Sequence, residues 1–291
     1  MSSETESFQP DTALRVVVRG GGDLGTGVAW RLHRCGFRVL VTEVAEPRVI
    51  RRAVAFASAI YGFPEKARHG AITVDGVTAR LVPNDDEVLT AWERDEVPVV
   101  VDAEAAVVRR LQPEAVVDAI MAKRNLGTSI TDAPIVVVLG PGFTAGIDCH
   151  AVVETHRGHN LGRVIEQGSA EPDTGVPGRV GGEGARRVLR ATRAGAFRAR
   201  RAIGDRVEEG TPIATVEGEP IRSLIDGVVR GLLQDGLVVD ANDKVGDVDP
   251  RGVVEHCFTI SDKALAVGGA VVEAVLHLRR DRANMGGRIR R

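Results

Sequence analysis

Aromatic residues and cysteines are scarce in this 291-residue chain. It has seven Phe, two Trp and one Tyr, too few rings to expect the stacking surface that single-stranded nucleic-acid binders use. Its three cysteines, Cys35, Cys149 and Cys257, are odd in number and far apart. That spacing argues against a disulfide framework and for a reducing compartment. We therefore expect a cytoplasmic protein with no nucleic-acid partner.

A strong net charge and long apolar runs are also missing. The formal charge is −2, because 38 Lys and Arg nearly balance 40 Asp and Glu. The chain as a whole is thus not attracted to nucleic acid or to an anionic membrane. No apolar run reaches 18 residues, so no membrane-spanning helix is expected. The acidic, polar residues 1–13 are predicted to be a disordered leader rather than a signal peptide.

What the first half does contain is an alternation of apolar runs with helical patterns. LRVVV (14–18) is typical of a buried strand, residues 24–35 have apolar positions at helical spacing, and FRVLV (37–41) is a second strand. The Asp75-Gly76 pair predicts a hairpin turn. Further apolar runs follow at 97–102, 115–122 and 135–140. The pattern predicts an α/β fold, with a Rossmann-like, mostly parallel, nucleotide-binding sheet over residues 14–167.

The second half has a different character. Residues 168–184 are rich in Gly and Pro and form either a linker or a loop that covers a site. Short β runs with a weak internal repeat follow, and they predict a β-rich domain similar to a barrel-sandwich hybrid over 185–260. The hairpin between its halves has no Lys, which excludes a biotinyl or lipoyl arm. A terminal helix over 261–280, capped by Ser261, precedes a basic tail at 281–291.

The stretch VVVRGGGDLGTG (16–27) carries the first functional pattern. Gly20, Gly22 and Gly25 match G-x-G-x-x-G between a predicted strand and a predicted helix, and Glu43 follows near the end of the next strand. In dinucleotide-binding folds, such glycines admit a pyrophosphate and the acid accepts a hydrogen bond from a ribose hydroxyl. NAD(P) or another nucleotide is therefore a candidate cofactor. The alternative is a turn whose glycines serve packing alone.

Two charged residues complicate that interpretation. Asp23 lies among the glycines, where it either caps the helix or repels a phosphate. Arg19 comes immediately before them, at a strand end that faces the ligand crevice of such sheets. We consider Arg19 either an anion contact that offsets Asp23 or part of a surface salt bridge.

A second group of functional residues lies between 136 and 165. Gly140, Gly142 and Phe143 follow a predicted buried strand, so their loop could donate backbone N–H groups to an anion. Basic side chains that could bind the same anion follow, namely Arg157, His159 and Arg163. Cys149 is a candidate sulfur donor or nucleophile, against the commoner outcome of a buried thiol. No H-E-x-x-H or paired C-x-x-C pattern occurs, so no metal site is predicted.

Three stretches together make a resemblance specific. They are similar to the YqeB-type proteins, a family named for selenium-dependent molybdenum hydroxylase systems. The three stretches are RGGGDLGTGVAWRLHRCGFRVLVTEVAEPRVIRRAVAF, AIMAKRNLGTSITDAPIVVVLGPGF and ETHRGHNLGRVIEQGSAEPDTGVPG. The resemblance extends over residues 14 to 275. It implies an accessory role in maturing molybdenum hydroxylases of the xanthine dehydrogenase type. Molybdenum hydroxylase subunits or other maturation proteins would be the partners, and the molybdenum cofactor, a small anion, the ligand.

Three functions therefore stay open from the sequence. The first is a maturation factor that binds a nucleotide or the phosphate end of the molybdenum cofactor. The second is an NAD(P)-dependent oxidoreductase, although no Tyr-x-x-x-Lys pair is present. The third is a non-enzymatic nucleotide-binding scaffold. Homo-oligomers are compatible with all three, and the residues do not decide whether the protein is an enzyme.

Overall fold

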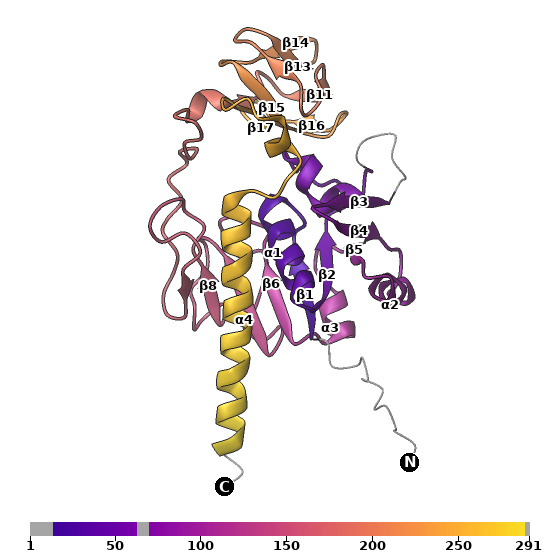
Figure 1. Ribbon diagram of the computed structural model, residues 1–291, viewed down its shortest axis with the longest axis vertical. Helices are drawn as coiled ribbons and strands as arrows, with labels where there is room; N and C mark the ends of the chain where they lie inside the picture. Colours follow the sequence, from indigo (N-terminus) through magenta and orange to yellow (C-terminus); the bar gives the residue numbers. More distant parts are fainter. Residues whose placement is uncertain (1–13, 63–69, 289–291) are drawn as a thin grey trace, which may run out of the picture.

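A nine-stranded sheet forms the larger part of the molecule in the computed structural model, which describes residues 14–62 and 70–288. The strands are arranged in the order β3-β4-β5-β2-β1-β6-β7-β8-β9 (Figure 1). In that order their bounds are Ala71–Val74, Val77–Leu81, Val97–Val101, Arg38–Glu43, Arg15–Arg19, Ala115–Asp118, Ile135–Leu139, Ala151–Val153 and Val164–Ile165. The six central pairs are parallel, and both edges are antiparallel hairpins. The β3–β4 turn confirms the hairpin predicted at Asp75-Gly76.

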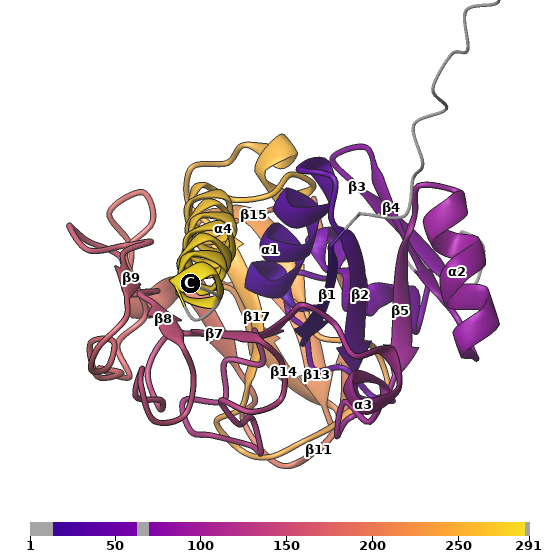
Figure 2. The ribbon, with the colours of Figure 1, turned by 90° about the horizontal axis from the view of Figure 1, so that it is seen from below.

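Helices cover both faces of this sheet (Figure 2). α1 (Asp23–Arg34) and α4 (Asp262–Arg288) pack on one face, whereas α2 (Asp85–Glu93) and α3 (Val107–Leu111) pack on the other. Because glycine has no side chain, α1 and α4 approach closely: a Cβ on Gly27 would lie 2.7 Å from the Ala264 carbonyl oxygen, and one on Gly268 would lie 2.5 Å from that of Gly27. The end of the chain thus completes the layer begun by α1.

The prediction of a Rossmann-like sheet followed by a barrel-sandwich hybrid is wrong. A Rossmann half winds by successive β-α-β crossovers, yet β6 joins β7, and β7 joins β8, through segments without a helix. The face over β7, β8 and β9 is covered instead by α4, from the other end of the sequence. Local periodicity cannot reveal that a helix from the far end of the sequence takes the place of the crossover helices. The result is a mixed α/β sheet with antiparallel edges.

The remaining strands form two four-stranded antiparallel sheets, here called the β unit, in the region where the weak repeat predicted a barrel-sandwich hybrid. One has the order β10 (Val188–Arg190), β17 (Lys244–Asp249), β15 (Gly227–Leu232) and β12 (Arg206–Val207). The other has the order β14 (Glu219–Arg222), β13 (Pro212–Val216), β11 (Gly195–Ala199) and β16 (Val238–Val239). Their inner faces enclose a separate apolar core around Phe197 and Ile213.

The β unit is joined to the large sheet through a buried segment of two short 3₁₀ turns, Arg52–Val54 and Phe56–Ala59. Arg52 Nε donates to the Leu232 carbonyl oxygen over 2.9 Å. A Cβ on Gly231 would lie 2.7 Å from the Ile50 carbonyl oxygen, so the two backbones are in direct contact. The described helices include none that is long and apolar enough to cross a membrane.

Candidate functional site: a cationic cleft

A cleft of about 410 Å³ lies between the carboxyl ends of the central strands, the first turn of α4 and the β unit. Seven Lys and Arg side chains and five Asp and Glu side chains line it. The cations are Arg51, Lys123, Arg157, Arg187, Arg230, Lys244 and Lys263, and the acids are Asp23, Glu154, Glu171, Asp173 and Asp247. Part of the Gly/Pro-rich stretch, from Thr174 to Val180, closes one side, so it covers the cleft rather than serving only as a linker.

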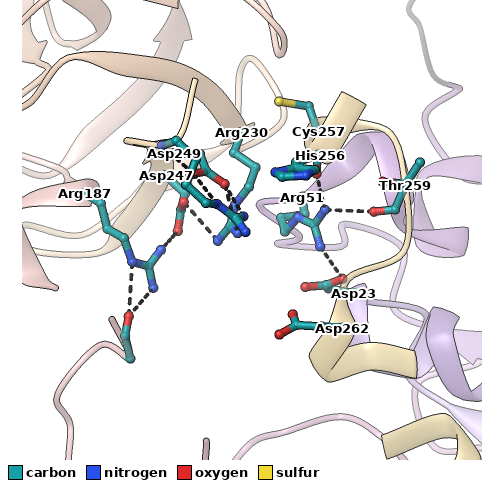
Figure 3. Close-up of polar contacts among 12 residues, drawn as sticks. Asp23, Arg51, Arg187, Arg230, Asp247, Asp249, His256, Cys257, Thr259 and Asp262 are labelled. Carbon is teal, nitrogen blue, oxygen red and sulfur yellow. Dashed lines mark hydrogen bonds and ion pairs between the residues drawn. The ribbon is translucent and has the colours of Figure 1, made fainter. Parts of the chain in front are cut away.

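Arg51 ties three parts of the chain together at this cleft (Figure 3). Its guanidinium donates to Asp23 Oδ1 over 2.8 Å and to the carbonyl oxygens of His256 and Thr259 over 2.9 and 3.1 Å. Asp23 is therefore neither the predicted cap nor a free anion. The N-cap of α1 is Gly22, which has no side chain that could cap the helix. The Asp23 carboxylate instead neutralises Arg51.

The first turn of α4 presents a second ion pair and an unpaired lysine. Arg157 donates to both oxygens of Asp262 over 2.8 Å, and this holds the pKa of Asp262 below its usual range. Lys263 lines the cleft, and no carboxylate of residues 14–62 and 70–288 lies within ion-pair distance of it. Its pKa is lowered by burial and by the nearby Arg157. Ser261 caps the helix by accepting from Ala264 N over 3.2 Å.

On the β unit, three cations share one buried carboxylate. Arg187 hydrogen-bonds to Asp247, Arg230 Nη2 lies 3.1 Å from Asp247 Oδ1, and Lys244 Nζ lies 3.5 Å from Oδ2. The Asp247 side chain is 2% exposed. Burial lowers the pKa of Lys244, although 43% of its side-chain surface is exposed. We call Arg187, Arg230 and Lys244 the β-unit cluster.

The predicted glycine loop borders this cleft, but its polar groups are used inside the fold. Gly20 N donates to the Thr42 carbonyl oxygen, and Gly21 N donates to Glu43 Oε2 over 2.9 Å. Burial raises the pKa of Glu43, while hydrogen bonds from Val44 N and Gly21 N oppose the rise. Ala57 N donates to the Gly21 carbonyl oxygen over 2.9 Å, so the buried 3₁₀ segment covers the loop. Glu43 thus closes the loop instead of standing free for a ribose.

Gly25 has a purely steric role. A Cβ at this position would lie 2.0 Å from the Gly20 carbonyl oxygen, a distance that no side chain tolerates. Gly22, in contrast, has φ −68° and space for a Cβ, whose nearest neighbour would be Val49 Cγ1 at 3.6 Å. The G-x-G-x-x-G spacing therefore reflects the packing of α1 on β1.

Arg19 points away from the cleft. It is 4% exposed and donates to Thr128 Oγ1, which donates in turn to Asp118 Oδ2 over 2.6 Å. Beyond it lies a separate groove beside α3, also lined by Arg109 and His150. Arg19 therefore lies in a different groove from Arg157 and does not face Asp23 across the cleft.

The second predicted cluster is divided. Gly140, with φ +72°, and Gly142, with φ +104°, lie beside the cleft, where a Cβ on Gly142 would lie 2.5 Å from the backbone of Lys123. Phe143 is buried in the apolar cluster behind this loop. Of the predicted basic residues, Arg157 lines the cleft, whereas His159 and Arg163 are exposed and outside its lining.

Cys149 lies in the same apolar cluster as Phe143 and has no exposed surface. Burial raises its pKa to about 12, with Asp148 adding to the rise. A thiol in this environment stays protonated at neutral pH, which does not suit a nucleophile or a sulfur donor. Within residues 14–62 and 70–288, no group of three or more His, Cys, Asp and Glu side chains is placed to hold a metal ion.

Sequence reasoning missed Arg51, Lys263 and the β-unit cluster. One signal was present: Asp247 and Asp249 are two residues apart within the strand KVGDVD, so both point to one face. Carboxylates in a buried strand require partners, and basic residues of neighbouring strands are the nearest candidates. The pattern does not indicate that three cations would meet one acid, because two of them come from other segments.

Comparison with curated proteins identifies a relative whose name assigns it no activity. No protein-family model matches the chain. It is 49% identical over 263 residues to "Uncharacterized protein YqeB" of Escherichia coli K12, a match that covers 90% of this chain and 47% of the relative. The chain thus spans about half the length of the curated relative it matches.

Similar solved structures include an aspartoacylase family protein from Mesorhizobium loti and a succinylglutamate desuccinylase/aspartoacylase from Rhodobacter sphaeroides. They are 12% and 15% identical, cover 81% of this chain and 85% of their own, and give TM-scores of 0.25 and 0.24. At such scores the likeness carries no argument about fold or activity. The sequence match, in contrast, supports the resemblance drawn from the three motif stretches: over 263 residues the chain is similar to a YqeB-type protein.

Proposed function

We propose that the cleft binds a phosphate-bearing anionic cofactor and that the protein is an accessory factor for the maturation of molybdenum hydroxylases. The observation that carries the proposal is Lys263, a half-buried cation that forms no ion pair with a carboxylate of the described residues, in a cleft where Lys and Arg outnumber Asp and Glu. A cation without a partner in a confined site favours an anion, because each ion compensates the other for lost hydration.

The molybdenum cofactor suits such a site chemically. It is a pyranopterin with a phosphate, often extended by a nucleotide, and the cleft volume of about 410 Å³ lies within the usual range for small-molecule sites. Lys263 and Arg157 would hold the phosphate at the first turn of α4, where the helix dipole also favours negative charge. The cofactor is the cargo here, and the chain's own residues bind and orient it.

An NAD(P)-dependent oxidoreductase is the competing function, and the glycine loop weighs against it. The Gly21 amide and both carboxylate oxygens of Glu43 make hydrogen bonds within the protein. A dinucleotide would have to displace these bonds and the buried 3₁₀ segment over the loop. Lys263 in the cationic cleft requires no such rearrangement, because no carboxylate of the described residues forms an ion pair with it.

Binding and delivery can be tested separately. Calorimetry with isolated molybdenum cofactor, CTP and NADH should show binding of the first, at least about tenfold weaker in Lys263→Gln, because a charge-assisted hydrogen bond is worth roughly 1.5–3 kcal/mol. Arg198→Gln, at an exposed pair on the β unit (57% exposed), is the matched control and should bind as the unaltered protein does.

The accessory role needs a second readout. Apo molybdenum hydroxylase should gain activity faster when the cofactor is supplied on this protein than when it is supplied free, and Lys263→Gln should lose the advantage. NADH binding with substrate-dependent turnover, without cofactor binding, would establish the oxidoreductase instead.

A further inference from the structure

We propose that the β-unit cluster of Arg187, Arg230 and Lys244 is a second anion subsite, so that the ligand carries two phosphate-type groups and bridges the β unit and the large sheet. This inference rests on the proposed function only because both place their ligand in the same cleft. Its ligand class is narrower: diphosphates, including nucleoside diphosphates and nucleotide-extended pterins.

The first argument is charge balance. Four cations, the β-unit cluster and Arg251, stand against two carboxylates, Asp247 and Asp249. Both carboxylates are at most 2% exposed, whereas Arg187 and Arg230 are 9% and 12% exposed. The excess over the carboxylates lies on Lys244 and Arg251, each 43% exposed, so it is half-buried positive charge that favours an anion nearby. A phosphate-type group beside Asp247 would neutralise this excess.

The second argument is unused hydrogen-bonding capacity. Arg230 Nε is buried and has no hydrogen-bond partner among the residues that the structure describes. The contacts from Arg230 to Asp247 and Asp249, at 3.1 and 3.6 Å, are ion pairs without a hydrogen bond. Guanidinium groups bind phosphate oxygens in pairs through two N–H donors. Arg230 therefore has donors to spare on the wall of the cleft.

The third argument is the position of the cluster opposite the first subsite. Figure 3 shows Arg187, Arg230 and Asp247 on one side, and Asp23, Arg51 and Asp262 on the other. All three cations of the cluster and Lys263 line the same cleft. The covering loop is fixed to the cluster, because Arg187 Nη2 donates to the Gly178 carbonyl oxygen over 3.0 Å. A ligand between them would contact the β unit, the loop and the start of α4 together.

Titration calorimetry with inorganic phosphate and inorganic pyrophosphate tests the subsite. Pyrophosphate should bind at least about tenfold more tightly than phosphate, since a second charged contact adds roughly 1.5 kcal/mol or more. Lys244→Gln and the charge-conserving Arg230→Lys should each abolish most of that preference. Arg198→Gln, the exposed control on the same unit, should keep it. Melting temperatures establish that each variant is folded.

The outcomes distinguish this inference from the proposed function. If Lys244→Gln and Arg230→Lys leave the pyrophosphate preference unchanged while Lys263→Gln weakens cofactor binding, the second subsite is wrong and the proposed function stands. If pyrophosphate binding depends on Lys244 but the molybdenum cofactor does not bind, the function is wrong and the subsite stands. Failure of the unaltered protein to bind pyrophosphate overturns the subsite directly.

Discussion

The glycine loop and the β-unit cluster lie at the same cleft but differ in how many of their polar groups already have partners within the protein. The loop carries the sharpest motif in the sequence, yet its Gly20 and Gly21 amides and the Glu43 carboxylate have partners within the protein. The β-unit cluster carries no motif, yet its cations exceed the acids around them. Motif spacing here reports how backbones pack, whereas unbalanced charge marks where a ligand fits.

Gly25→Ala should have the largest effect, because it tests whether the glycine pattern serves packing. The new Cβ would lie 2.0 Å from the Gly20 carbonyl oxygen, and separating α1 from β1 should cost about 4 kcal/mol or more. Urea denaturation of the purified variant, or its failure to accumulate as folded protein, measures this.

Gly22→Ala is the matched variant in the same loop. It has room for a Cβ, so the free energy of unfolding should change by less than about 1 kcal/mol, the size expected for a helix N-cap. If Gly22→Ala instead stays stable but loses ligand binding, the loop contacts the ligand and the contrast with the β-unit cluster breaks down.

Asp247→Asn should cause the next largest loss of stability. It removes the carboxylate that the three cations of the cluster share, and loss of one partner from a buried charge network costs about 3–5 kcal/mol. Sulfate or pyrophosphate should raise the melting temperature of this variant more than that of the unaltered protein, because the added anion replaces the lost charge.

The exposed pair between Arg198 and Asp235 provides the comparison for that experiment. Asp235→Asn should cost about 0.5 kcal/mol or less, since exposed ion pairs contribute little, and anions should not rescue it. Equal losses in Asp247→Asn and Asp235→Asn would show that the burial of the cluster has no energetic consequence.

A pH titration separates Lys263 from the arginines around it. The protonated amine binds an anion, and burial with Arg157 lowers the pKa of Lys263, so sulfate affinity should fall by about tenfold as pH rises, at values below the ordinary lysine pKa of about 10.4. Sulfate is the suitable probe, because it does not itself titrate in this range. The carboxylates that face Lys263 are those of Asp23, Glu154 and Asp262.

Lys263→Arg keeps the charge but removes the titration. It should bind sulfate at neutral pH and lose most of the alkaline decline, apart from the part due to Lys244. A decline of the same size in Lys263→Arg would assign the titration to another group.

Much of the local structure was predictable and most of the site was not. The strand at LRVVV, the helix after the glycines and the Asp75-Gly76 hairpin depend on short-range periodicity and turn chemistry, and all three are present. The placement of α4 over β7 and β8 depends on contacts across more than 100 residues. A prediction that assumes consecutive β-α-β winding therefore assigns the wrong fold after β6.

The site shows the same limit. Arg157 was predicted and lines the cleft, whereas His159 and Arg163, close to it in sequence, do not. Arg19 lies at the end of a strand, as the motif predicts. Its side chain donates to Thr128, which donates to Asp118, and it lies outside the cleft lining. Charge clusters assembled from separate strands have no sequence period, so the β-unit cluster becomes visible only once the strands are paired.

Cys149→Ala should have the smallest effect, and it tests the last chemical role that the sequence left open. The thiol is fully buried with a pKa raised to about 12, while Cys35 is exposed. Alkylation of the folded protein near pH 8 should modify Cys35 rapidly and leave Cys149 unmodified until denaturant is added. Because a small buried group is removed, the variant should lose about 1 kcal/mol of stability and keep its anion binding. Rapid labelling of Cys149, or loss of hydroxylase activation in the alanine variant, would contradict this. It would show that the thiol is reactive and takes part in the protein's function.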